Sequence, residues 1–303
     1  MTKTSKTASI CKKTAYKKTK SYEADHMARI RALTAITAAS IGLAGAGWAQ
    51  TFPEQSRTDQ GWNVRLDFGL LAAPKYYGDD EYQISALPGV RISYSDILFA
   101  SINEGIGFNL IRTGALRAGP ILRYDFGRDQ DGDSMFRISG GGTNDLLGLG
   151  DVDGTVELGG FVEYSANQFE AYLEVRNGLG GGHDGMIGAA RFDYKTTLTG
   201  FGPPAFFAVG PTISFASSDY NGAFFDVNAA QSAASGLAVY NAGGGINSYG
   251  LSASLTIPVS QTAAITAIAG YDVLSGDVGD SSLVQQRGSR SQGRFGLFTG
   301  FQF

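Results

Sequence analysis

The chain ends with Gln292-Gly-Arg-Phe-Gly-Leu-Phe-Thr-Gly-Phe-Gln-Phe303. Every second residue from Phe295 to Phe303 is large and apolar except Thr299, and the residues between them are mostly small or polar. This period of two is that of a β-strand with one apolar and one polar face. Because an unpaired apolar edge strand invites aggregation, a soluble protein rarely ends in this way. The stretch therefore predicts a strand whose apolar face meets lipid and whose pairing closes a barrel.

The terminal Phe303 also resembles the last residue of bacterial outer-membrane proteins. In those proteins the final strand, with its terminal Phe, is recognised by the barrel-assembly machinery. The resemblance is partial, because Phe298 stands where a Gly is usual, with Gly296 and Gly300 beside it. It implies that the barrel-assembly machinery is a partner of this chain.

The rest of the chain has the composition of a β-protein that lies in a membrane. It contains 43 Gly and 33 Phe or Tyr residues among 303, which suits strands separated by turns. Its mean hydropathy is near zero, as expected when lipid-facing and lumen-facing residues alternate. Charged residues at every second position, as in Gly61–Ala73, suit a polar lumen better than a dry sandwich core.

Eleven segments have a strand-like pattern: Gly61–Ala73, Ser85–Tyr94, Ile97–Leu110, Gly114–Phe126, Thr155–Ser165, Gln168–Asn177, Met186–Thr197, Ala205–Ala216, Ser248–Pro258, Thr262–Leu274 and Gln292–Phe303. Bacterial single-chain barrels contain even numbers of strands. We therefore predict an all-β, antiparallel transmembrane barrel of about 12 strands in the outer membrane, with the twelfth strand inside 217–247. Ten strands and a soluble β-sandwich of the same length are the alternatives. Residues 127–153, 217–247 and 275–291 are otherwise expected to be irregular loops.

The first 49 residues follow a different pattern. Met27-Ala-Arg-Ile-Arg is basic, residues 32–46 are small and apolar, and Gly47-Trp48-Ala49 has the small-x-small form of a cleavage site. This order predicts a secretory signal peptide that starts at Met27 and is cleaved after Ala49. Its apolar run is too short to cross a membrane as a helix. The prediction divides the chain into an extension and signal peptide, 1–49, and a barrel, 50–303.

Removal of residues 1–49 would leave 15 basic and 26 acidic residues, a net charge of 15 − 26 = −11. This balance disfavours nucleic acid as a partner. Cys11, the only cysteine, would also leave, so the mature chain would have no disulfide and no thiol chemistry.

Three motifs resemble known kinds of site, but none is predicted to be one, so we expect no catalytic, cofactor-binding or metal-binding residues. Asp129, Asp131 and Asp133 alternate as in a Ca²⁺ loop. A Ca²⁺ loop has Gly at its sixth place and an acidic residue at its twelfth. This chain has Ser134 and Gly140 there, so a solvated acidic loop is expected. His183 lies among glycines without a Gly-x-Ser-x-Gly motif, which predicts a flexible surface histidine. The glycine runs 140–142 and 243–245 lack the Lys-Ser/Thr of a phosphate loop.

A set of charged residues falls on the face opposite the aliphatic side chains. Mixed signs can line a narrow pore, or they can pair and fill a small lumen. We expect mostly paired, structural charges. The set is Arg65, Asp67, Arg117, Arg123, Asp125, Glu157, Glu163, Glu170, Glu174, Arg176, Arg191, Asp193, Lys195 and Arg294.

Several short motifs, in order and spacing, resemble the MipA/OmpV family of outer-membrane proteins, and the resemblance covers nearly all of residues 61–303. The motifs are Pro74-Lys-Tyr-Tyr-Gly-Asp-Asp, Ala118-Gly-Pro-Ile-Leu-Arg-Tyr with Gly127-Arg-Asp, Leu149-Gly-Asp-Val-Asp with Glu157-Leu-Gly-Gly-Phe, Ser218-Asp-Tyr, Phe224-Phe-Asp-Val, Gln231-Ser-Ala-Ala-Ser-Gly-Leu with Tyr240, and Asp280-Ser-Ser-Leu-Val. Ser282 departs from the small residue or Pro that is usual there.

The resemblance implies a Gram-negative outer-membrane location and contact with outer-membrane lipids. It also implies a non-enzymatic scaffold that links a membrane-bound lytic transglycosylase to a bifunctional peptidoglycan synthase. Other members are described as adhesins, osmotically regulated proteins or antibiotic-uptake proteins. A narrow channel or uptake protein for small solutes is therefore the alternative function, and an enzyme is disfavoured by the absence of a cysteine from the mature chain and by its single histidine.

Overall fold

The computed structural model describes residues 35–36, 53–54, 61–132, 136–200 and 202–303. Within the first two ranges, β1 (Ala35–Ile36) and β2 (Pro53–Glu54) pair as a small antiparallel sheet in a separate unit. The predicted signal peptide and its cleavage after Ala49 lie almost entirely outside the described residues, so they stay predictions.

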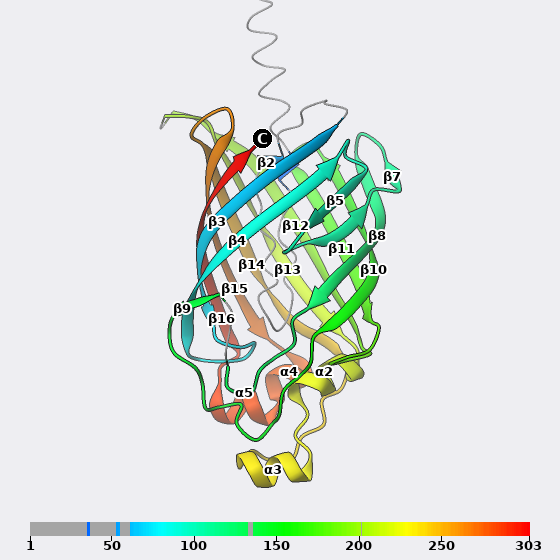
Figure 1. Ribbon diagram of the computed structural model, residues 1–303, viewed down its shortest axis with the longest axis vertical. Helices are drawn as coiled ribbons and strands as arrows, with labels where there is room; N and C mark the ends of the chain where they lie inside the picture. The colour runs from blue at the N-terminus through cyan, green and yellow to red at the C-terminus, as the bar shows by residue number, and fades with distance from the viewer. Residues whose placement is uncertain (1–34, 37–52, 55–60, 133–135, 201) are drawn as a thin grey trace, which may run out of the picture. The chain divides into compact units, whose positions relative to one another are not determined.

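Residues 61–303 form an antiparallel β-barrel of twelve strands (Figure 1). The ring of strands is complete, because the last strand pairs with the first and β8 pairs with β10. The strands of the closed circuit are β3 (Trp62–Pro74), β4 (Tyr82–Tyr94), β5 (Leu98–Ser101), β6 (Gly105–Phe108), β8 (Leu116–Asp125), β10 (Thr155–Ala166), β11 (Phe169–Gly178), β12 (Met186–Leu198), β13 (Ala205–Ala216), β14 (Gly245–Pro258), β15 (Ala263–Leu274) and β16 (Ser291–Gln302). Two short strands, β7 (Ile111–Arg112) and β9 (Arg137–Ser139), pair with β8 and β4 beside this circuit.

The predicted strand number is confirmed, but the predicted position of the twelfth strand is wrong. The segment predicted as one strand, 97–110, turns back on itself and forms both β5 and β6. The backbone N–H of Glu104 donates to Ser101 Oγ at 2.9 Å, and Gly105 has a φ of +83°, a conformation that glycine adopts without strain. These residues make the turn that the apolar alternation concealed.

The stretches predicted as irregular contain four helices. Residues 217–247 hold α2 (Ser218–Phe225) and α3 (Ala229–Ser235), while α4 (Gly276–Asp280) and α5 (Ser282–Arg287) follow β15. The side chain of Asn228 caps α3, and Gly236 ends it with a φ of +80°, so local signals explain this helix well. No helix among the described residues is long and apolar enough to cross a membrane.

The alternation of β16 places its side chains as predicted. Phe295, Leu297 and Phe301 are 57%, 51% and 46% exposed on the outer face, whereas Phe298 is 1% exposed inside the barrel. The strand pairs with β3 from Phe295↔Ala72 to Gln302↔Arg65. The last strand therefore removes the edge of the first, and its apolar face is left for lipid.

The two ends of the barrel differ in their connections. Ser95 and Asp96 make a tight turn beside the start of the barrel. The N–H of Ser95 donates to the carbonyl of Gly61, and the N–H of Gly61 donates to Ser95 Oγ. The four helices and the long connections gather at the opposite end from the C-terminus (Figure 1). Bacterial barrels have short periplasmic turns and long extracellular loops, so the helical end is the extracellular one.

Candidate functional site: a charged lumen under a helical cap

The extracellular connections fold into a cap with its own hydrophobic core. Its central side chains Tyr220, Leu146 and Leu283 are completely buried. The core joins chain segments far apart in sequence, namely Tyr76, Leu146, Leu149, Ile187, Ala216, Tyr220, Phe224, Phe225, Val227, Leu237, Ala242, Leu274, Val278, Leu283 and Val284. Because each segment buries apolar surface against the others, the cap is a packed layer rather than a set of loose loops.

Hydrogen bonds from side chains to backbone carbonyls link the segments of the cap. Arg287 donates through Nη1 to the carbonyl of Asp145 at 2.6 Å and through Nη2 to that of Ser235. The Gln231 amide donates to the carbonyl of Leu149 at 2.7 Å. These bonds connect α5, α3 and the long connection after β8, so the cap spans the mouth as one unit.

Asp79 ties the first extracellular loop to the last strand. It is completely buried, its Oδ1 accepts the N–H of Glu81 at 2.9 Å, and its carbonyl accepts the side-chain amide of Gln292 at 3.1 Å. Its Oδ2 has no hydrogen-bond partner among the described residues. Burial raises the pKa of the Asp79 carboxyl to about 6, although the bond from Glu81 opposes the shift.

Beneath the cap, the inward-facing charges form ion pairs, as predicted. Arg176 Nε lies 2.7 Å from Glu157 Oε2, Arg123 Nη1 lies 3.1 Å from Glu174 Oε1, and Arg117 lies 2.7 Å from Glu163. The remaining pairs are Arg176–Glu174, Arg191–Glu170, Arg191–Asp193, Lys195–Glu170, Arg65–Asp67 and Arg294–Asp272. No residue of the predicted inward set is exposed. Opposite charges on the same and neighbouring strands therefore pair with one another along the inner face of the barrel.

A small apolar cluster also faces inward, on β3, β4 and β16. Phe298 packs inward with Leu71, Ala73 and Leu87. A Cβ added at Gly69 would lie 1.8 Å from the Phe298 ring, so this glycine makes the space that the ring occupies. Bulky apolar side chains thus occupy part of the lumen beside the charges.

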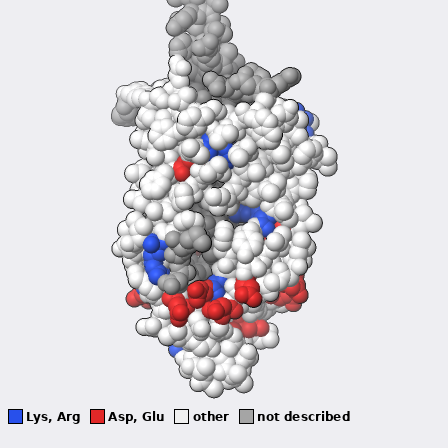
Figure 2. All heavy atoms as spheres, in the orientation of Figure 1, with Lys and Arg blue, Asp and Glu red and all other residues white. Residues whose placement is uncertain are grey.

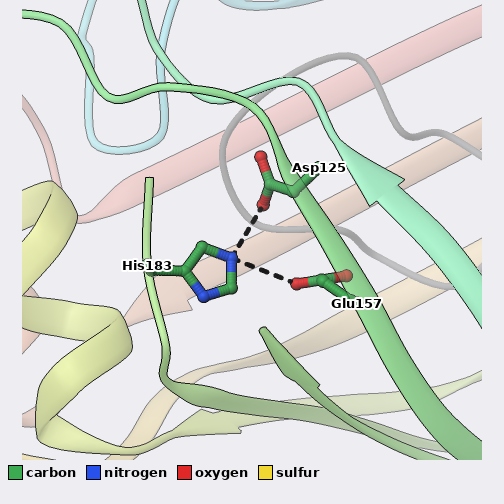
Figure 3. A group of neighbouring side chains, drawn as sticks. All are labelled: Asp125, Glu157 and His183. Atoms are coloured by element: carbon green, nitrogen blue, oxygen red, sulfur yellow. Dashed lines mark ion pairs between the residues drawn. The ribbon is translucent and has the colours of Figure 1, made fainter. Parts of the chain in front are cut away.

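His183 lies where the charged wall meets the cap, which contradicts the prediction of an exposed histidine. It is 4% exposed, and its Nε2 lies 3.4 Å from Glu157 Oε1 and 4.0 Å from Asp125 Oδ2. Asp125 ends β8 and Glu157 lies in β10, while His183 belongs to the loop that joins β11 to β12. Figure 3 shows both carboxylates directed at the imidazole. We call these three residues the buried trio.

The glycines around His183 serve close packing rather than mobility. Gly181 has a φ of +113°, and a Cβ on Gly178 would lie 2.6 Å from His183 Nδ1. The Oγ1 of Thr155 accepts the N–H groups of Gly182 and His183 at 2.8 and 3.1 Å. The loop therefore turns inward and fixes the ring. The run of glycines on both sides of a lone histidine was the available signal for such close packing.

Aromatic rings of α2 cover the imidazole from the cap side. The rings of Tyr220 and Phe224 lie 4.7 and 6.1 Å from that of His183 between centroids. The Tyr220 hydroxyl donates to Asp125 Oδ2 at 3.4 Å, and burial raises the pKa of this phenol well above its ordinary value. Neither ring nitrogen of His183 has a hydrogen bond in the described part of the chain.

The acidic motif of the loop after β8 is not part of the trio. Asp129 and Asp131 are exposed, and Asp129 Oδ1 accepts the N–H of Asp131 at 3.3 Å. Asp133 lies outside the described residues. The exposure of the first two agrees with the predicted solvated loop.

A pocket of about 530 Å³ lies on the cap side of His183. Besides His183 it is lined by three acids, Asp184, Asp219 and Asp226, of which the first two are exposed. Figure 2 shows a further concentration of acidic residues around the extracellular end of the barrel. Such a surface attracts cations toward the histidine.

A closed twelve-stranded barrel with an apolar outer face, a charged lumen and a folded extracellular cap defines an outer-membrane β-barrel protein. The chain belongs to the MipA family, because the model of that family, described as MltA-interacting protein MipA, matches residues 66–303. The resemblance in the sequence motifs is thereby confirmed, as is the outer-membrane location. No curated protein gives a significant match to the chain.

Solved structures similar to this chain include three outer-membrane proteins. OmpTΔL8, a loop-deletion mutant of OmpT of Vibrio cholerae, is 9% identical with a TM-score of 0.33, over 81% of this chain and 100% of that one. OprD of Pseudomonas aeruginosa is 12% identical with a TM-score of 0.34, over 88% and 73%. The NanC porin is 10% identical with a TM-score of 0.36, over 78% and 98%.

Proposed function

We propose that this protein is a non-enzymatic, non-conducting platform in the outer membrane that binds a murein lytic transglycosylase and links it to a murein synthase. The observation that supports it is that the inward charges are paired, Phe298 packs inside the barrel, and the extracellular connections pack into a cap. The family description names an interaction with MltA, and a closed barrel suits such a binding role better than transport.

The platform would bind its partners at the periplasmic end, because murein and its enzymes lie on that side of the outer membrane. The turn between β14 and β15 projects there, and its Ser260 and Gln261 are exposed. At the other end, α3 has no buried residues, so its surface can be altered without disturbing the cap. These two places provide a matched pair of test positions.

The test is capture of envelope proteins by the purified full-length barrel, followed by mass spectrometry. Two variants, Gln261→Cys and Ala230→Cys, each introduce a single cysteine into a protein in which Cys11 has been replaced. Each cysteine is then labelled with a bulky polyethylene glycol maleimide. We expect a lytic transglycosylase to be captured, and capture to fall at least about tenfold with the label at 261 and to persist with the label at 230. Recovery of no murein enzyme, or equal loss with both labels, would contradict the proposal.

A second function, passage of small solutes, is favoured by one feature of the wall. Strand β5 covers only Arg91–Tyr94 of β4, and β9 covers only Ile84 and Ser85. The N–H of Ala86 donates to the carbonyl of Phe136 at 2.8 Å. In the described part of the chain, residues 87–90 of β4 therefore have no strand partner on this side, and Figure 2 shows the surface hollowed on this face. Uptake of labelled solutes into proteoliposomes would test this alternative, and uptake that exceeds that of empty liposomes would favour it.

A further inference from the structure

We propose that the buried trio, Asp125, Glu157 and His183, is a binding site for a divalent transition-metal ion of the Zn²⁺ class. The site does not depend on the proposed partners. The three side chains come from β8, β10 and the loop after β11, and one ligand atom of each lies within 4.8 Å of the others. All three residues are at least nine-tenths buried.

The first step is the unused bonding capacity inside the cluster. His183 Nε2 and Glu157 Oε1 are both buried and both lack a hydrogen-bond partner in the described part of the chain. Buried polar atoms are nearly always satisfied, and an exception points to an unseen water or ion. Here the two unsatisfied atoms face each other at 3.4 Å (Figure 3).

The second step is the orientation of the carboxylates. Glu157 Oε2 accepts Arg176 Nε at 2.7 Å, and Asp125 Oδ1 accepts the N–H of Gly127 at 2.7 Å. In each group one oxygen is anchored, and the other is directed at the imidazole; in Asp125 this second oxygen also accepts the Tyr220 hydroxyl at 3.4 Å. This is how partners around a metal site fix the ligands that touch the ion.

The third step is distance and donor type. Zinc bound tetrahedrally at about 2.1 Å requires ligand atoms about 3.4 Å apart. The separations of 3.4 Å and 4.0 Å from His183 Nε2 are close to this value. One imidazole and two carboxylates suit a first-row divalent ion, and three protein ligands leave a position for water. The acidic pocket beside His183 would raise the local concentration of cations next to the site.

Such an ion would join the cap to the barrel wall, since His183 belongs to a cap loop and the carboxylates to two wall strands. The alternative is that a proton on His183 satisfies Glu157 without any metal. The two differ in whether the protein binds zinc.

The experiment uses full-length protein purified in detergent without a polyhistidine tag and stripped with EDTA. Zn²⁺ is titrated in competition with a chromophoric chelator. We expect one Zn²⁺ per chain, and binding at least about tenfold weaker in His183→Ala and in Glu157→Gln. The control Asp129→Asn, an exposed acid outside the trio, should bind like wild type. Heat-modified mobility on gels identifies the folded variants.

Co²⁺ provides a second readout of the site. A four-coordinate Co²⁺ complex with nitrogen and oxygen ligands absorbs in the visible region, and this absorption should disappear in Asp125→Asn. This variant also keeps the test possible if His183→Ala does not fold. The proposal is overturned if stripped wild-type protein binds no stoichiometric Zn²⁺, as the protonated-histidine alternative predicts. Unchanged Zn²⁺ affinity in a folded trio variant would overturn it equally.

Discussion

Asp79 is the residue whose protonation should control the stability of the cap. Its folded-state pKa of about 6 lies above the ordinary 3.8, so the folded protein holds this proton more tightly than the unfolded chain does. The stabilisation is complete below pH 3.8 and is lost as the pH rises through about 6. Asp79→Asn, which stays neutral, should therefore stabilise the cap above pH 6, by about 1–2 kcal/mol.

Limited proteolysis of the cap at pH 4.5 and 7.5 measures this effect. Wild type should be cleaved faster at pH 7.5, and the Asn variant should lose most of that difference. The exposed neighbour provides the control Asp80→Asn, which should keep the wild-type pH dependence. A cap equally resistant at both pH values in wild type would show that Asp79 does not act in this way.

Phe303 should matter more for assembly than for the stability of the finished barrel. It is 70% exposed, and its N–H donates to the carbonyl of Val64 at 2.9 Å. Its ring contributes at most about 1.5–3 kcal/mol if lipid buries it fully. We expect Phe303→Ser to lower the amount of protein in the outer membrane severalfold, while the protein that arrives keeps nearly wild-type heat resistance in gel-shift assays.

The control for Phe303 is Phe295→Ser, which removes an outward aromatic side chain from the same strand. It should reduce heat resistance by a similar small amount and reach the membrane at normal levels. Normal levels of Phe303→Ser together with a large loss of heat resistance would contradict the assembly role.

Single residues were predicted well where alternation decides their environment. Arg176 and Glu157 lie on the polar face of their strands and do pair in the lumen. His183 was placed wrongly because its burial depends on tertiary packing against Tyr220 and Phe224, and these residues are about 40 positions away in a segment predicted to be irregular. A local pattern cannot show which distant rings will cover a loop.

At the scale of elements, the long strands were predictable because their alternation continues over ten or more residues. The turn between β5 and β6 was missed, since the four-residue strands on either side are too short to display a period of their own. The helices of the cap were missed for a related reason. Their exposed faces are rich in small residues, as in α3, which resemble a loop in composition.

The sides of the membrane on which these elements lie can be tested with the same single cysteines. Ala230→Cys in α3 should react with a membrane-impermeant maleimide in intact cells. Gln261→Cys in the turn after β14 should react only once the outer membrane is permeabilised. The reverse order would place the helical cap in the periplasm and overturn the assignment of the two ends.

For the whole molecule, the predicted leader remains to be tested. Gly47-Trp48-Ala49 predicts cleavage after Ala49, so N-terminal sequencing of outer-membrane material should begin at Gln50. Peptides that contain Cys11 should be absent from the same sample. Their recovery from the membrane protein would show that the first 49 residues are retained.

The barrel class and the paired charges were predictable, because both follow from one repeated alternation along the chain. The strand number needed in addition the rule that bacterial barrels have even numbers of strands, since the alternation alone gives eleven segments. The folded cap was not predictable, since its core forms from connections that show no period and that meet only after the barrel closes. The ion pairs inside the barrel were therefore predicted from the sequence, whereas the folded cap is seen only in the structure.

Planar-bilayer recording of the full-length protein tests the closed lumen most directly. The ion pairs such as Arg176–Glu174 and Arg191–Asp193 and the packed cap should prevent ion flow, so wild type should show no steady conductance. The Arg191→Ala variant should also be non-conducting while its cap is folded, because the protein has no open channel whose selectivity the substitution could alter. A reproducible open channel in wild type, with an ion selectivity that changes in Arg191→Ala, would contradict the account of a closed platform.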